Sequence, residues 1–456
     1  MNSGWLTAMV VLGAGIVCAQ DADVERLRRA AQEASYEITQ LKAEPDHVFV
    51  EYVIRPTSES FIRCQLALPV SSEKWNGRLW GFGNGGAAGG VRVNVDVAKR
   101  GSAAVHTDMG SSKGVHGKPE VMRDFGWRAT HLMTESAKVL VRACLGSAPS
   151  KSYFIGGSTG GGQGFHEALR FPEDYDGVIA YVPANTRIPL HVYFAWNLRL
   201  MNDAEGRPVF SKAELKAVED AAIEYFADKD EPWARGRFLS DSRYTPEREK
   251  GILAVAKKRC PSLDTPDKLE RLHKMFYGPV IEGRHVHSGV PFSAAMEPAA
   301  GNQWMLQWYL GPGRALHTVT DAELAAWLRE WGPDCDACGE GFAAFAKRGG
   351  KMIVIGGLED SIVPYPSMIE WYERAAKETG GAEALENACR LYLLPGRAHG
   401  KGRGCGGIIG DCDLIVDWVE KGVRPNEVKS DLKPGETLTV KPYPCYFSAL
   451  SAAKAD

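Results

Sequence analysis

Ser158 lies in the stretch GGSTG, which fits the G-x-S-x-G pattern of a serine nucleophile. The apolar run YFI at residues 153–155 precedes it, and the helix-like sequence GFHEALRF at residues 164–171 follows it. A serine on a sharp turn between strand and helix is exposed for attack, and the helix N-terminus stabilises a developing oxyanion. Flanking glycines let the strand and the helix approach closely. The sequence therefore predicts a nucleophile elbow at Ser158.

Two other roles of a glycine-rich turn fit this stretch less well. A phosphate-binding loop of this kind needs a Lys-Ser or Lys-Thr pair after the glycines, and none follows here. A dinucleotide-binding turn needs glycines spaced as G-x-G-x-x-G, which the residues around Ser158 do not match.

A serine hydroxyl needs a base that takes its proton and an acid that orients the base. In folds with this elbow the chain order is serine, acid, histidine. His399, in LYLLPGRAHG, is the only histidine after residue 317, and Asp360, with Glu359 beside it, follows the apolar run KMIVIGG. Because carboxyl ends of parallel strands share one sheet edge, we expect Ser158, Asp360 and His399 to form a triad. The alternatives are a helix-capping aspartate and an ordinary loop histidine.

An oxyanion hole needs two backbone N–H donors. One is expected at Thr159, directly after the nucleophile, and the other in the loop GFGNGGAAGG at residues 81–90, at Gly85 or Gly86. A flexible surface turn is the alternative interpretation of that loop.

The elements that position these residues are those of an α/β fold. Short apolar runs ending in Gly, Pro or Asp are typical of buried parallel strands, and helix-like segments alternate with several of them. These runs are GRLWGFGNGG, GSAAVHTD, SYFIGG, GVIAYVP, KMIVIGG and RLYLLPG. HVFVEYVIRP and FIRCQLALPV alternate apolar and polar residues, which predicts an antiparallel pair. The alternation of strands and helices is interrupted from about residue 196 to residue 335 by a polar, helix-rich stretch.

The N-terminal sequence and the composition indicate an exported globular protein. The apolar run WLTAMVVLGAGIVCAQ predicts a signal peptide cleaved after Ala19, and hence a secreted or periplasmic protein; an uncleaved apolar helix is the alternative. A net charge of −3 gives no reason to expect a nucleic-acid or membrane partner. The predicted division is residues 1–19 as signal peptide, 20–195 and 336–456 as the two core parts, and 196–335 as an inserted domain.

Nine cysteines follow Cys18, and this number favours some disulfides. Cys335 and Cys338 form a single CxxC; without a second ligand pair nearby, a local disulfide or plain thiols are favoured over zinc. His285 and His287 would share one side of a strand, but no third metal ligand lies close by, so we interpret them as packing or surface histidines.

With these motifs in place, the chain resembles the tannase and feruloyl esterase family, which includes mono(hydroxyethyl) terephthalate hydrolases. The matching landmarks are WNGRLWGFGNGGAAGG, AAVHTDMGSS, SYFIGGSTGGGQGFHEALRFPEDYDGVIAYVPAN, MFYGPVIEGRHVHSGVPFSAAMEP, IVIGGLEDSIVP and LIVDWVEKGVRPNEV. The resemblance implies an α/β-hydrolase fold with a lid inserted before the aspartate strand. It also implies hydrolysis of esters of aromatic acids by the same triad.

The chain departs from that family around the triad. The family usually has cysteines before the serine and after the histidine, joined by a disulfide, and these positions are Gly157 and Gly400 here. The triad must therefore be held by packing and hydrogen bonds. The family's basic residue four positions after the serine is Gly162.

The lid also differs from the pattern that the resemblance implies. The segment matching the family's calcium loop keeps Asp228, Asp230 and Asp241 but loses its glycines, so we expect no tight calcium site and no cofactor. Trp304 and Trp308 lie on one helical face; we interpret them as core rather than as substrate-binding residues.

We therefore expect a serine carboxylic ester hydrolase that acts on small-molecule esters of phenolic acids. The same triad could instead transfer an acyl group or cleave a carbon–carbon bond, and a non-catalytic binding protein could keep the fold. The sequence does not predict the acyl group, the alcohol or the oligomeric state.

Overall fold

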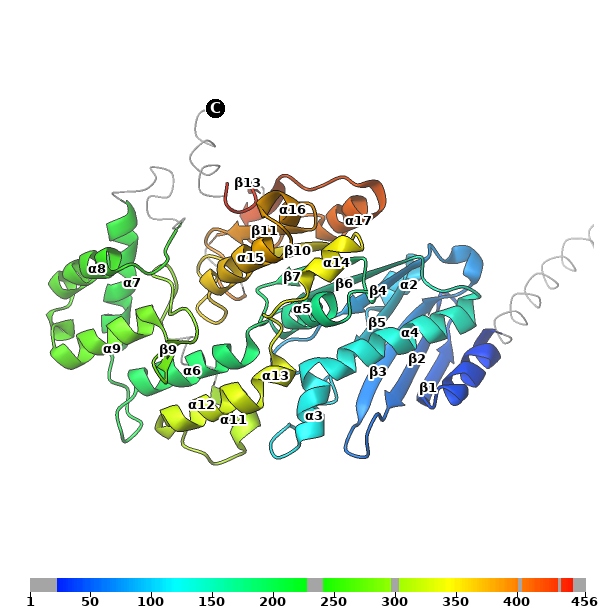
Figure 1. The fold of residues 1–456 in the computed structure, drawn as a ribbon, viewed down its shortest axis with the longest axis horizontal. Coiled ribbons are helices and arrows are strands. Elements are labelled where there is room, and N and C mark those ends of the chain that lie inside the picture. Colours follow the sequence, from blue (N-terminus) through cyan, green and yellow to red (C-terminus); the bar gives the residue numbers. More distant parts are fainter. Residues whose placement is uncertain (1–22, 228–240, 297–302, 401–403, 434–435, 446–456) are drawn as a thin grey trace, which may run out of the picture. The chain divides into compact units, whose positions relative to one another are not determined.

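A computed structural model describes residues 23–227, 241–296, 303–400, 404–433 and 436–445 (Figure 1). The expected signal peptide, residues 1–19, lies outside the described residues. Contacts within the chain divide it into two units. The first unit comprises Met1–Asn84, Ala88–Ile155 and Glu173–Asp176, and the second comprises Gly85–Ala87, Gly156–Pro172 and Gly177–Asp456.

The first unit contains the antiparallel strands predicted near the N-terminus. Its strands follow the order β1-β2-β3-β5-β4-β6, and their bounds are β1 (Glu37–Ala43), β2 (His47–Ile54), β3 (Ile62–Pro69), β4 (Arg78–Phe82), β5 (Ala103–Thr107) and the start of β6 (Lys151–Gly157). β2 and β3 pair antiparallel, which confirms the prediction, and β4 pairs parallel with β5 and β6. The helices of this unit include one at residues 23–33, α2 (Val95–Lys99), α3 (Pro119–Arg123) and α4 (Ala129–Leu145). α4 packs against β3 and β5.

The second unit contains three parallel strands, of which the last two along the chain precede the predicted acid and base. These strands are β7 (Gly177–Tyr181), β10 (Lys351–Gly357) and β11 (Cys389–Leu394), paired parallel in the order β7-β10-β11. They are buried along nearly their whole length, as expected for strands covered on both faces. Its flanking helices are α5 (Thr159–Arg170), α15 (Pro366–Glu378), α16 (Ala382–Glu386) and α17 (Asp411–Lys421). Both α5 and α17 contact β7. The predicted α/β class is thus confirmed.

A helix-rich insertion separates β7 from β10, as the sequence predicts. Its described helices are α6 (Arg187–Met201), α7 (Lys212–Ala227), α8 (Pro246–Arg259), α9 (Pro266–Tyr277), α11 (Gln303–Leu310), α12 (Asp321–Glu330), α13 (Gly332–Cys335) and α14 (Phe342–Lys347). The short strands β8 (Val280–Ile281) and β9 (Arg284–His285) pair with each other. A separate domain bounded at residues 196 and 335 stays a prediction.

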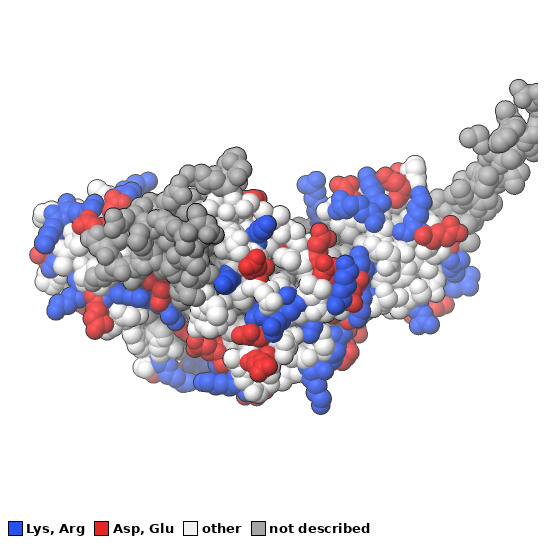
Figure 2. Space-filling view, turned by 90° about the horizontal axis from the view of Figure 1, so that it is seen from above, with Lys and Arg blue, Asp and Glu red and all other residues white. Residues whose placement is uncertain are grey.

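Three of the described strands, β1, β12 (Val428–Lys433) and β13 (Glu436–Val440), were not predicted from the sequence. β1 has mostly exposed residues, and β12 with β13 forms an antiparallel hairpin. On the face shown in Figure 2, basic and acidic side chains are interspersed rather than gathered by sign. Within the described ranges, no helix is both long and apolar enough to cross a membrane.

Candidate active site

Ser158 occupies a strained turn between β6, which ends at Gly157, and α5, which begins at Thr159. Its backbone angles are φ 57° and ψ −117°, a region that L-residues rarely adopt. A Cβ added at Gly156 would lie 2.5 Å from the backbone of Gly160, so only glycine permits this approach of strand and helix. The predicted sharp turn between strand and helix at Ser158 is therefore present.

The next glycines bring α5 against the segment that follows β7. A Cβ at Gly161 would lie 2.7 Å from the Cα of Pro183, and one at Gly162 would lie 2.7 Å from the carbonyl oxygen of Ala184. The loss of the basic side chain at Gly162 thus accompanies a backbone approach that leaves no room for any side chain.

The structure brings the three predicted triad residues together within the second unit. The Nε2 of His399 lies 3.0 Å from the Ser158 Oγ, and its Nδ1 lies 2.8 Å from the Asp360 Oδ2. Asp360 is fully buried, whereas the His399 side chain keeps 23% of its surface exposed. An imidazole bridging a hydroxyl and a buried carboxylate has the geometry needed for nucleophile activation.

Asp360 is fixed by its own turn after β10. Its Oδ1 accepts hydrogen bonds from the backbone N–H groups of Ile362 at 2.8 Å and Val363 at 2.9 Å, which leaves Oδ2 for His399. The residue that caps α15 is Tyr365, so the alternative of a helix-capping Asp360 is wrong.

The loop predicted to supply the oxyanion hole meets the elbow at Gly86. The carbonyl oxygen of Gly86 accepts hydrogen bonds from the Thr159 Oγ1 at 2.5 Å and from the Arg187 Nη2 at 3.0 Å. The Arg187 Nη1 also donates to the Thr159 Oγ1 at 2.9 Å. The backbone N–H of Thr159 begins α5, where no intrahelical acceptor exists for it. The choice between Gly85 and Gly86 as second donor stays a prediction.

Sequence reasoning missed Arg187. It is 4% exposed at the start of α6 and fastens the loop 85–87 to the elbow. A signal was available, because Arg187 opens the largely apolar run RIPLHVYFAW, and an arginine is seldom buried without a partner.

The first turn of α6, where Arg187 lies, is in turn held by the half-buried Asp336. The Asp336 Oδ1 accepts the backbone N–H of Ile188 at 2.8 Å, at the first turn of α6. Burial raises the pKa of Asp336 to about 7, although the charges of Arg170 and Arg187 oppose the rise.

Within the described residues, the cysteines considered below form no disulfide, so the predicted disulfides are not present among them. Cys335 and Cys338 are both free, so the local disulfide is not formed and plain thiols describe this CxxC. The other free thiols with a described environment are Cys64, Cys144, Cys260, Cys389 and Cys405. Burial raises the pKa of the Cys338 thiol to about 11, which disfavours the reactive thiolate.

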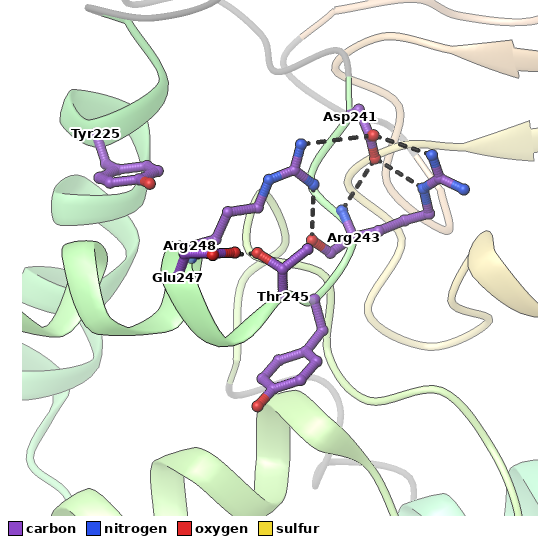
Figure 3. A pocket seen from close by; sticks show the side chains of 7 residues that line it. Tyr225, Asp241, Arg243, Thr245, Glu247 and Arg248 are labelled. Carbon is purple, nitrogen blue, oxygen red and sulfur yellow. Dashed lines mark hydrogen bonds and ion pairs between the residues drawn. The ribbon is translucent and has the colours of Figure 1, made fainter.

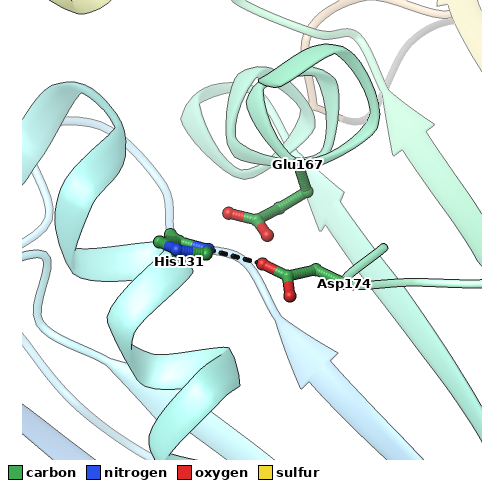
Figure 4. Close-up of side chains that lie close together, drawn as sticks. All are labelled: His131, Glu167 and Asp174. Atoms are coloured by element: carbon green, nitrogen blue, oxygen red, sulfur yellow. Dashed lines mark hydrogen bonds and ion pairs between the residues drawn. The ribbon is translucent and has the colours of Figure 1, made fainter. Parts of the chain in front are cut away.

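The histidine pair of the insertion does not share a strand side. β9 ends at His285, which is exposed and contacts the carbonyl oxygen of Tyr277, whereas His287 is buried and its Nδ1 contacts the carbonyl oxygen of Ser288 at 2.7 Å. In the first unit, His131 of α4 contacts Asp174 at 2.6 Å (Figure 4), a pair that sequence reasoning did not single out.

A pocket of about 580 Å³ in the insertion contains none of the triad residues. It is lined by Tyr225, Asp241, Arg243, Tyr244, Thr245, Glu247 and Arg248 (Figure 3). Asp241 accepts a hydrogen bond from the Nε of Arg243 at 2.9 Å and lies 3.5 Å from the Nη2 of Arg248. Asp228 and Asp230 lie outside the described residues, and the expected lack of a calcium site stays a prediction.

The expected helix of the two tryptophans is present as α11. The ring of Trp308 packs edge-on against that of Tyr309, with centroids 5.1 Å apart. The side chain of Trp304 lies outside what the structure describes.

The chain is similar to known esterases in sequence and in fold. The chain matches the family described as "Tannase and feruloyl esterase" over residues 48–326 and 313–447. It is 26% identical over 417 residues to "Probable feruloyl esterase B-1" of Aspergillus fumigatus, covering 80% of this chain and 78% of that protein. It is 24% identical over 456 residues to "Mono(2-hydroxyethyl) terephthalate hydrolase" of Piscinibacter sakaiensis, covering 81% and 74%.

Among solved structures, feruloyl esterase B from Aspergillus oryzae superimposes with a TM-score of 0.76 at 21% identity. The match covers 90% of this chain and 93% of that one. This likeness shows the shared α/β-hydrolase fold.

Proposed function

Because the chain belongs to the tannase and feruloyl esterase family and is a carboxylic ester hydrolase, we propose that it cleaves small esters of phenolic acids with a Ser158–His399–Asp360 triad. The observation that carries this proposal is the position of His399, 3.0 Å from the Ser158 hydroxyl and 2.8 Å from the Asp360 carboxylate. The names of the two relatives support the substrate class, since ferulate and terephthalate are both aromatic acids.

In the first half of the reaction, the Ser158 Oγ attacks the ester carbonyl carbon while its proton moves to the His399 Nε2. The carbonyl oxygen becomes an oxyanion, held by the N–H of Thr159 and by an N–H of Gly85 or Gly86. The intermediate then collapses, the bond to the alcohol oxygen breaks, and the alcohol leaves with the proton from His399.

In the second half, His399 takes a proton from water as the water oxygen attacks the acyl carbon. The bond to the Ser158 oxygen breaks, the serine regains the proton, and the acid is released. Asp360 fixes the imidazole tautomer and stabilises its charged form throughout. This chemistry uses no metal or other cofactor.

Substrate selection falls to the insertion between β7 and β10, which acts as the lid in this proposal. Export from the cytoplasm, to the periplasm or the medium, is supported by the N-terminal apolar run.

The experiment is a hydrolysis screen of purified protein against methyl ferulate, methyl gallate, a terephthalate monoester and an aliphatic ester. We expect turnover of at least one aromatic ester. Ser158→Ala should lower kcat by about 10⁴-fold or more while the circular dichroism spectrum and melting temperature stay unchanged. Substantial residual activity in Ser158→Ala would reject the nucleophile, and a product ester formed with added alcohol would indicate acyl transfer.

A further inference from the structure

The loop that carries His399 needs support from outside itself. The described residues 395–400 and 404–410 connect the end of β11 at Leu394 to the start of α17 at Asp411, and the His399 side chain is partly exposed. With glycine at positions 157 and 400, no covalent bond can tie it to the elbow there. We infer that Tyr181 is the positioning residue that joins the nucleophile elbow to the His399 loop, an inference that rests on the proposed function.

The backbone of Tyr181 holds the elbow. Its carbonyl oxygen accepts the N–H of Ser158 at 2.9 Å, and a Cβ added at Gly157 would lie 3.6 Å from its own Cβ. Tyr181 is the last residue of β7, opposite Ile355 in the β7–β10 ladder, so its backbone is fixed by the sheet.

The side chain of Tyr181 holds the loop on both sides of His399. Before the histidine, the guanidinium of Arg397 stands 5.4 Å from the centroid of the Tyr181 ring. After it, the Tyr181 hydroxyl donates to the Asp411 Oδ2 at 2.8 Å and accepts the N–H of Ile408 at 3.3 Å. The Tyr181 side chain thus contacts residues on both sides of His399, while the Tyr181 backbone is hydrogen-bonded to Ser158.

The same loop is also hydrogen-bonded to the segment that carries Asp360. The carbonyl oxygen of Arg397 accepts the backbone N–H of Glu359 at 3.0 Å, directly before Asp360. Burial and the nearby Asp411 raise the pKa of Tyr181, so its hydroxyl stays protonated and can donate across the working pH range.

Tyr181→Phe removes the hydroxyl and keeps the ring over Arg397. We expect kcat to fall about tenfold with KM unchanged within about twofold, because a loosened His399 spends less time within reach of Ser158. The matched control is Tyr52→Phe, which loses a 2.8 Å hydrogen bond to Ser136 in the first unit and should leave kcat unchanged. If Tyr181→Phe keeps the wild-type kcat, or lowers only the melting temperature as the control does, the inference is wrong.

A double-mutant cycle with Asp411→Ala tests the pair itself. Because both single changes break the same hydrogen bond, Tyr181→Phe combined with Asp411→Ala should lower kcat by no more than the larger single effect. Multiplying effects would show that the two residues act separately, which contradicts the inference.

A covalent rescue distinguishes positioning from general stability. In the Tyr181→Phe background, Gly157→Cys with Gly400→Cys should restore kcat to within about threefold of wild type when peptide mapping shows the new disulfide, and reductant should abolish the gain. A formed disulfide without rescue would overturn the inference. If the wild-type protein hydrolyses none of the esters, the proposed function is wrong. If the wild type is active and Ser158→Ala is inactive, the proposed function stands, and the Tyr181 variants then test the inference alone.

Discussion

Ser158 and His399, the proposed nucleophile and base, are held in different ways. Ser158 sits in a turn made by backbone contacts, where Gly156 and Gly160 approach so closely that a single added Cβ does not fit. His399 sits on a loop held by backbone hydrogen bonds, such as that from the Glu359 N–H to the Arg397 carbonyl oxygen, and also by the Tyr181 side chain. A Cβ added at the neighbouring Gly400 would meet nothing within 4 Å. At Gly156 the turn therefore tolerates no added Cβ, whereas the loop at Gly400 tolerates substitution.

The largest expected difference in stability is that between Gly156→Ala and Gly400→Ala. Gly156→Ala should lower the free energy of unfolding by about 3 kcal/mol and abolish activity, because the strand and helix must move apart. Gly400→Ala should change stability by less than about 0.5 kcal/mol. Urea unfolding of both variants measures this, and equal losses would contradict the comparison.

A substitution of Arg187 tests how the loop 85–87, proposed to bind the oxyanion, is held against the Ser158 turn. Arg187→Met removes the bonds to Thr159 and Gly86, so kcat should fall about 10- to 100-fold with little change in KM. Arg199→Met on the same helix is the control, because Arg199 bonds Val319 in the insertion instead. A rise in KM alone would place Arg187 in substrate binding rather than in positioning the loop.

The meeting of Ser158, His399 and Asp360 could be predicted because the sequence pattern that marks each of them is local. Each residue follows a short apolar strand, the order along the chain is fixed by the fold, and strand ends of a parallel sheet meet at one edge. No such pattern marks Tyr181 or Arg187, whose roles arise from contacts with segments distant in the sequence. β1 was missed for another reason: its sequence EITQLKA is largely exposed and lacks an apolar run.

A smaller effect is expected from Asp336, whose contribution to the free energy of unfolding depends on pH. Because burial raises its pKa from 3.8 to about 7, the folded state binds the proton more tightly than the unfolded state between these values. Its contribution to stability is therefore greatest below about pH 4 and is lost as the pH rises toward 7. Asp336→Asn should flatten this part of the wild-type profile of unfolding free energy, whereas the exposed Asp96→Asn should not. Parallel profiles for wild type and Asp336→Asn would contradict the raised pKa of Asp336.

The smallest expected effect is that of reductant, which should be none. Gly157 and Gly400 leave no thiols beside Ser158 and His399, so dithiothreitol should change neither kcat nor the melting temperature. The positive control is the wild-type chain carrying Gly157→Cys and Gly400→Cys, whose activity should become sensitive to reductant if the new thiols pair across the elbow and the loop. Loss of wild-type activity without unfolding would reveal a covalent tie in the site. In that case a disulfide would hold His399 near Ser158, and the contrast drawn here between the Ser158 turn and the His399 loop would be wrong.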